Sequence, residues 1–448
     1  MKKFISLLVA AALCAGSSVA VFGADIPEGW HAVSDEELGL PSEEEERAIT
    51  AALRNGGKEI TDDEYAALYA PERRDIDCLP DMDIAGKYLG EDGMNYNVET
   101  YINPTFTNIH RLYYCTQVLM YTGHGYHDRV IIVPDNADED QRTGVYMGDT
   151  NLTDDGYEAV LVGLGNKDMS DCRFALFACC LAASPNYSNN LARYVIANGA
   201  ETSLGWRVEV GSQDLHIWED LFFDGLERGL TIFESAKIAN SNKNIYSDPG
   251  SILANGIFGN EDQKLSENNN RNIMEEYGFI KVDKKLNIDC EKGDLDELTE
   301  YLAEHVEGFA PDKFEVELIN NSVDKKDYYT ILYGLKINGF DTPFGITVFV
   351  EDDSIEYVVS FEKEDMEKFN TAPLKFTEYG FEEEIEKAKK EAAKEAPDDA
   401  VMEWQEVLKK LDENLKPYLL VKTSCKDEYG GVFLLTYEYD LDVDDIEG

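Results

Sequence analysis

Basic residues are scarce in this chain of 448 residues, where 40 lysines and arginines stand against 90 aspartates and glutamates. The formal net charge is -50, and a surface with so few cations repels nucleic acids and anionic surfaces. We therefore expect no nucleic acid among the partners. The acidity itself is typical of a protein that stays in solution outside a cell.

Long apolar runs are also missing beyond the N-terminus. Only the run from Phe4 to Ala15 stands out, and it is shorter than the roughly 20 apolar residues that a membrane-spanning helix needs. It follows Met1-Lys2-Lys3 and precedes the small residues Gly16 to Ala20, which is the order of a secretory signal peptide. The sequence predicts a signal peptide over residues 1–24, no membrane span, and a secreted, extracellular product.

Metal-binding motifs are incomplete. The sequence has no spaced Asp/Asn loop with a closing Glu, so the acidity alone leaves calcium as an alternative. His124 and His127, followed by Asp128, supply half of a zinc site with a cysteine, but a second paired ligand motif is missing. We expect no metal and no cofactor, with calcium and a metal-dependent hydrolase kept as alternatives.

Cysteines are few and odd in number once the signal segment is removed. Eight are present, and Cys14 lies in the predicted signal peptide, so at least one of the remaining seven is unpaired unless it joins another chain. Cys290 and Cys425 form a disulfide only if the fold brings them close enough. A free thiol outside the cell indicates a catalytic role.

The chain changes character along its length. Residues 25–88 are acidic and turn-rich and are interpreted as an N-terminal arm, which inhibits the protein until removed in one hypothesis. Short apolar runs alternate with amphipathic stretches over 89–286, which predicts a layered α/β domain with a mostly parallel central sheet. Residues 287–448 read as a separate α+β region, where a helix at Met402 to Leu411 repeats a helix-then-strands order and suggests two related units.

Two helices of the central domain carry clear start signals. Asn189 or Asn190 is expected to cap a helix that stops at Gly199. Thr231 and Glu234 have the spacing of a capping box.

Two apolar segments each place a reactive side chain directly after a predicted strand. Met120 to Gly125 carries His124, and Phe174 to Cys180 carries a thiol. The carboxyl ends of neighbouring parallel strands line one crevice, so the two groups can meet although they are distant in sequence. An imidazole next to a thiol removes its proton and later protonates the leaving amine. The pattern predicts a cysteine nucleophile with a histidine base.

Adjacent residues on a strand point to opposite faces, so only one of Cys179 and Cys180 can face His124. We take Cys180 as the nucleophile and Cys179 as its rival. The backbone N–H groups of Gly125 and Cys180 are the predicted donors to the oxyanion.

These segments resemble the clan CD cysteine peptidases, the caspase-like group that includes gingipains, clostripain, separase and CHAT-type proteins. The likeness covers roughly Asn103 to Leu265: a strand ending in His-Gly, a strand ending in a small residue and Cys, a helix, a Gly-Ala turn and a strand. His124 and Cys180 are 56 residues apart, near the caspase interval of about 50. The caspase form Gln-Ala-Cys-x-Gly is absent, and Phe177 to Ala182 is similar instead to bacterial relatives, an alignment that favours Cys180.

The resemblance implies a caspase-like fold and a secreted cysteine endopeptidase that hydrolyses peptides or proteins. It also implies that Trp206 and Arg207 border the pocket for the substrate residue before the cleaved bond, although Arg207 can equally pair with surface carboxylates. The alternative function is a catalytically silent caspase-like binding or adhesion protein. In either case the C-terminal region is a candidate surface for an unknown partner.

Overall fold

The computed structural model describes most of residues 26–441. The longer stretches outside the description are 1–25, 46–64, 110–115, 133–141, 155–158, 243–248, 269–272, 367–380, 427–430 and 442–448, and single residues to triplets are left out elsewhere. The predicted signal peptide therefore lies outside the described residues. Among the described helices, none is long and apolar enough to cross a membrane.

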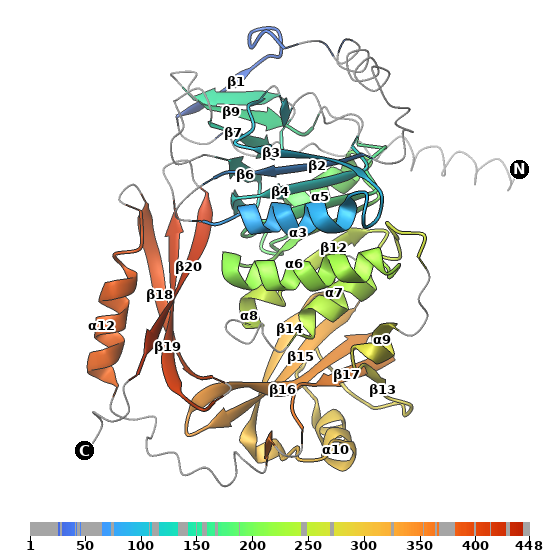
Figure 1. Ribbon diagram of the computed structural model, residues 1–448, viewed down its shortest axis with the longest axis vertical. Helices are drawn as coiled ribbons and strands as arrows, with labels where there is room; N and C mark the ends of the chain where they lie inside the picture. Colours follow the sequence, from blue (N-terminus) through green and yellow to red (C-terminus); the bar gives the residue numbers. More distant parts are fainter. Residues whose placement is uncertain are drawn as a thin grey trace, which may run out of the picture.

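The smaller of two sheets has six strands in the order β12-β11-β10-β4-β2-β3 (Figure 1). Only β12 runs antiparallel to its neighbour; the other four pairings are parallel. The strands are β2 (Tyr65–Ala70), β3 (Asn97–Ile102), β4 (Val118–Thr122), β10 (Phe174–Ala178), β11 (Thr202–Trp206) and β12 (Asn255–Gly259).

Helices cover both faces of the six-stranded sheet. One face packs on α3 (Leu79–Leu89), α6 (Ser212–Glu227), α7 (Ile232–Asn240) and α8 (Pro249–Ile252), and the other on α5 (Leu191–Ala197). The expected caps are confirmed: the Asn190 side chain accepts from the Arg193 N–H at 3.0 Å, and Thr231 and Glu234 bond each other reciprocally. These helices fix the positions of β4 and β10, the strands that lead to His124 and Cys180.

The larger sheet has 14 strands and mixed directions. Its first part contains β1 (Trp30–Val33), β5 (His124–Tyr126), β6 (Arg129–Ile132), β7 (Arg142–Tyr146), β8 (Asn151–Asp154) and β9 (Ala159–Gly163). It continues through β18 (Val401–Leu411), β19 (Pro417–Lys426) and β20 (Val432–Asp440), and then through β13 (Ile280–Lys281), β14 (Phe314–Asn320), β15 (Tyr328–Ile337), β16 (Phe340–Glu351) and β17 (Ser354–Val359).

The expected fold class, a caspase-like α/β domain built on a mostly parallel central sheet, is wrong for this chain. Strand outweighs helix in the described residues, and the dominant element is the mixed 14-stranded sheet. The prediction failed because β5–β9, which lie between β4 and β10 in the chain, join the larger sheet together with the C-terminal strands, and a strand pattern does not show which sheet a strand joins.

Residues 287–441 form two packed units, each with one helix followed by antiparallel strands. The first has α10 (Asp296–His305), a short 3₁₀ turn (Pro311–Lys313) and β14–β17, with the small helix α9 (Ile273–Glu276) nearby. The second has α12 (Glu382–Ala392) and β18–β20, with a core of its own. The helix expected at Met402 to Leu411 is wrong, because this segment is β18.

In the large sheet, single ladder pairs join the two C-terminal units to each other and the second unit to β5. One ladder pair, Asp341 with Lys410, joins β16 to β18, and one pair, Gly125 with Val432, joins β5 to β20. In Figure 1 the strands β18–β20 stand on the left, just inside α12, and extend from the level of β16 up to about that of β4. The last strand of the chain therefore meets the segment that follows β4.

Gly123 marks the point where the chain leaves the smaller sheet and enters the larger one. Its φ of +148° is a backbone angle that side-chain-bearing residues rarely adopt, and a Cβ there would lie 3.0 Å from the Ile131 carbonyl oxygen. The turn directs the next residue, His124, out of β4 and into β5.

Two helix glycines should respond oppositely to alanine. At Gly225 in α6 an added Cβ would lie 2.9 Å from Ser235 Oγ and 3.2 Å from Ser235 Cα on α7, so Gly225→Ala should lower the free energy of unfolding by about 1–3 kcal/mol. At Gly86 in α3 nothing lies within 4 Å, so Gly86→Ala should raise it by about 0.5–1 kcal/mol. Urea denaturation of both variants checks the pair; equal effects would contradict the close approach of α6 and α7.

Candidate active site

The ends of β4 and β10 bring the two predicted reactive groups to one edge of the six-stranded sheet. The strands are parallel neighbours, and their last residues, Thr122 and Ala178, lie opposite each other in the ladder. His124 and Cys180 each follow two residues later. Because of this register, the segment with His124 and the segment with Cys180 leave the sheet next to each other.

Cys179 lies on the face of β5 away from the imidazole. A Cβ placed on Gly125 would fall 2.4 Å from Cys179 Sγ, so this thiol packs directly against the Gly125 backbone. His124 and Gly125 are adjacent on a strand and their side-chain directions oppose each other. Cys179 is completely buried, and burial raises the pKa of its thiol well above the ordinary value.

Cys180 lies in the other core, on the side reached by β20. Its Sγ accepts from the Val210 N–H at 3.3 Å and lies 3.6 Å from the Val210 carbonyl oxygen. The backbone of Leu434 on β20 also lowers the pKa of this thiol. Burial, only partly offset by these hydrogen bonds, raises the pKa of the Cys180 thiol to about 12, so at neutral pH it is protonated in this conformation.

β20 also covers the His124 ring. The imidazole is 2% exposed and stacks on Phe433, with ring centroids 4.1 Å apart and planes 13° from parallel. Phe433 and Leu434 are consecutive, so the imidazole and the thiol contact adjoining residues of the same strand. This shared contact is the strongest evidence that the two groups belong to one site.

The predicted oxyanion donors lie at the same edge. The Gly125 backbone pairs with Val130 on β6 and with Val432 on β20. Leu181, directly after Cys180, has a φ of +62°, so the chain turns sharply at the nucleophile candidate. The oxyanion role of the Gly125 and Cys180 N–H groups stays a prediction.

Trp206 and Arg207 lie at the end of β11, the strand next to β10. The Trp206 ring is fully buried, donates from Nε1 to the Ile252 carbonyl at 3.0 Å and packs edge-on against Trp218. Arg207 donates to the carbonyls of Asn320 and Ser322 rather than pairing with a surface carboxylate. Burial lowers the pKa of Arg207. Their role in substrate binding stays a prediction.

The elements of the metal alternative are engaged elsewhere. The His127 ring stacks on the Tyr187 ring, with ring centroids 3.4 Å apart. Arg129 donates two hydrogen bonds of 2.8 Å to the Asp128 carboxylate. Among the described residues, no group of three or more His, Cys, Asp or Glu side chains could hold a metal ion. Cys290 is a buried free thiol, so the disulfide with Cys425 does not form.

A buried acidic cluster supports the strand that leads into His124. Thr122 donates to Asp81 Oδ2 at 2.7 Å, and the other Asp81 oxygen lies 3.0 Å from His216 Nε2. Glu219 is fully buried beside Asp81, and burial, followed by the Asp81 charge, raises the pKa of Glu219 well above its ordinary value. Burial lowers the pKa of His216, but the hydrogen bonds and charges of Asp81 and Asp77 together outweigh burial, and the net pKa is raised.

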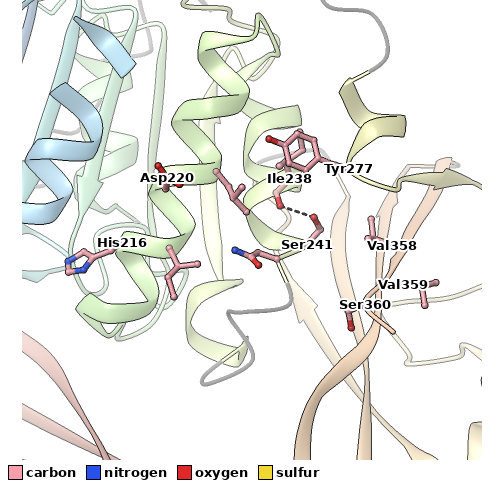
Figure 2. Close-up of a pocket in the computed structure, with 11 residues that line it drawn as sticks. His216, Asp220, Ile238, Ser241, Tyr277, Val358, Val359 and Ser360 are labelled. Carbon is pink, nitrogen blue, oxygen red and sulfur yellow. Dashed lines mark hydrogen bonds between the residues drawn. The ribbon is translucent and has the colours of Figure 1, made fainter. Parts of the chain in front are cut away.

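A cavity of about 670 Å³ lies between α6, α7 and β17 (Figure 2). His216 faces it from α6, but its Nε2 is held by Asp81 and by the Asp77 carbonyl. The Ser241 hydroxyl donates to the Ile238 carbonyl at 2.7 Å. The lining therefore offers no poised nucleophile and base, and the edge at His124 and Cys180 is the better candidate.

Sequence reasoning missed the acidic cluster and the contact of β20 with the candidate site, although it predicted a strand at 431–439. His216 carried no companion motif because its partner Asp81 lies on α3, far away in the chain. The run Val432-Phe433-Leu434 reads as an ordinary buried strand, and no pattern indicates which site it covers. The one usable signal in the sequence is the position of Glu219 among the apolar residues of its helix. A carboxylate is rarely buried without a partner, so this position indicates a buried polar partner nearby.

No protein-family model and no curated protein matches this sequence. One solved structure with a partial likeness is the Bacillus megaterium YpeB C-terminal domain, 12% identical, with an alignment that covers 36% of this chain and 66% of that one. Its TM-score is 0.21, so the likeness carries no argument about fold or function.

We expect the contribution of the acidic cluster to the free energy of unfolding to fall as the pH rises. Folding raises the pKa values of Glu219 and His216, so their contributions are complete at low pH and are lost above the unfolded values of about 4.3 and 6.5. Glu219→Gln should therefore gain thermal stability over the wild type between pH 5 and pH 8. Glu227→Gln, on the partly exposed side of α6, is the control. A Glu219→Gln difference that is constant with pH would contradict the buried, proton-holding carboxyl.

Proposed function

We propose that this protein is a secreted cysteine endopeptidase in which Cys180 is the nucleophile and His124 the base. One observation carries the proposal: both groups follow in-register ends of neighbouring parallel strands and contact adjoining residues of β20. The motif resemblance to clan CD peptidases supports the same chemistry. Secretion rests on the predicted signal peptide.

The reaction needs no group beyond the chain and water. Cys180 Sγ bonds to the substrate carbonyl carbon while its proton passes to His124, and the oxyanion is held by backbone N–H groups. The C–N bond then breaks, and the imidazolium gives its proton to the leaving amine. Water, deprotonated by His124, attacks the thioester, releases the carboxylic acid and restores the thiol.

The geometry favours Cys180 over Cys179 for this role. Cys179 is pressed against the Gly125 backbone on the face opposite to the imidazole. The Val210 N–H donates to the Cys180 sulfur at 3.3 Å and favours the thiolate, and Val210 does not belong to β20. A nucleophile needs such donors when the thiolate forms.

A catalytically silent binding protein is the second candidate, and one observation favours it. His124 and Cys180 are 2% and 3% exposed, so neither group meets a ligand in this conformation. Hydrolysis of a peptide library distinguishes the two functions.

The nucleophile assignment predicts a selective loss of labelling. During long incubation with a thiol-directed peptidyl probe, Cys180→Ala should lower labelling and peptide hydrolysis at least about 100-fold, because the attacking sulfur is gone. Cys179→Ala should change both by no more than about threefold once its folding is verified by thermal melting. Intact mass spectrometry and turnover of a mixed peptide library provide the readouts. Equal labelling of wild type and Cys180→Ala would refute the assignment.

A further inference from the structure

β20 enters the candidate site through three consecutive residues. Val432 pairs with Gly125, Phe433 stacks on the His124 ring, and the Leu434 backbone lowers the pKa of the Cys180 thiol. On its other side Leu434 forms a parallel bridge with Gly211. The extended segment Val432–Leu434 thus lies between the backbone of Gly125 and that of Gly211, and it covers the two reactive groups.

We infer that Val432–Leu434 occupies the groove in which an extended peptide substrate binds, and that it keeps the site closed until β18–β20 moves away. This inference rests on the proposed peptidase function. It assigns the regulation of that site to the C-terminal region, and it assigns the substrate to extended, unfolded segments that add to a strand edge.

The orientation of the covering peptide group would protect β20 from cleavage. The Phe433–Leu434 amide presents its N–H to the sulfur. In a trans peptide the carbonyl points opposite to the N–H, so the carbon–oxygen group that a nucleophile attacks is turned away. β20 binds as a substrate would, but with the unreactive side of its backbone toward Cys180.

The attachment of β20 is suited to release. α12 and β18–β20 share a core that is separate from the cores of the six-stranded sheet. This unit joins its neighbours in the large sheet through one ladder pair at each side, Asp341 with Lys410 and Gly125 with Val432. A separate core and short ladder junctions favour local opening without global unfolding.

Removal of β20 also restores the conditions that a thiol nucleophile needs. Val432 and Cys180 belong to the same buried cluster, and burial is the main cause of the raised thiol pKa. Water admitted by the departure of β20 lowers that pKa toward its ordinary value. The Gly125 edge, now paired with Val432, becomes available to a substrate backbone.

Three full-length proteins test the inference. Val432→Asp places a buried carboxylate opposite Gly125 and should drive β20 out, whereas Leu435→Asp puts the same charge at a half-buried position of that strand. Iodoacetamide labelling, mapped cysteine by cysteine, measures exposure. A mixed peptide library measures hydrolysis. The Cys180 labelling rate and the hydrolysis rate should both rise at least about tenfold in Val432→Asp and stay within about twofold in Leu435→Asp.

The other buried thiols report on unfolding. Cys78, Cys172 and Cys179 should stay protected in Val432→Asp, because only the cover has moved. If all of them react, Phe433→Gly, which removes the ring stacked on His124, serves as the milder variant. Unfolding of both variants would overturn the inference, since β20 would then be a structural strand and not a removable cover.

The outcomes separate this inference from the function on which it rests. Selective exposure of Cys180 without hydrolysis supports the cover and refutes the peptidase. Hydrolysis by the wild type at the rate of Val432→Asp refutes the cover and supports the peptidase. Unchanged Cys180 labelling in a folded Val432→Asp also refutes the cover.

Discussion

The candidate site depends on one constraint, the register of the parallel ladder between β4 and β10. Because Thr122 lies opposite Ala178, the segments after these residues leave the sheet at the same level. Gly123 then turns the chain into the 14-stranded sheet, and the Thr122 hydroxyl donates a hydrogen bond to the buried Asp81. A shift of one residue in this ladder would reverse the faces of the side chains and separate the imidazole from the sulfur.

The parts of the structure that local chemistry determines were predictable from sequence. The strands at 118–122 and 174–178, the Asn190 cap and the Thr231–Glu234 capping box follow from short-range patterns, and the structure confirms them. The neighbouring parallel ends of β4 and β10, two residues before His124 and Cys180, also follow from the sequence pattern.

Long-range pairing explains what could not be predicted. Trp404, Val407, Leu408 and Leu411 have helical spacing, yet 401–411 is a strand because it pairs with β19 along its whole length. Most of its side chains are exposed or half-buried, so no strand-like alternation reveals it. The same cause hid the 14-stranded sheet and the contact of β20 with His124, since strands far apart in sequence leave no local mark of their partners.

The position of β20 in the chain has a consequence for biogenesis. A polypeptide is made from its N-terminus, and domains fold as units while synthesis proceeds. The strands that carry His124 and Cys180 are therefore complete well before Val432–Asp440 leaves the ribosome. If β20 is the cover of the site, the nascent protein has its thiol uncovered through that interval, until Val432–Asp440 has been made.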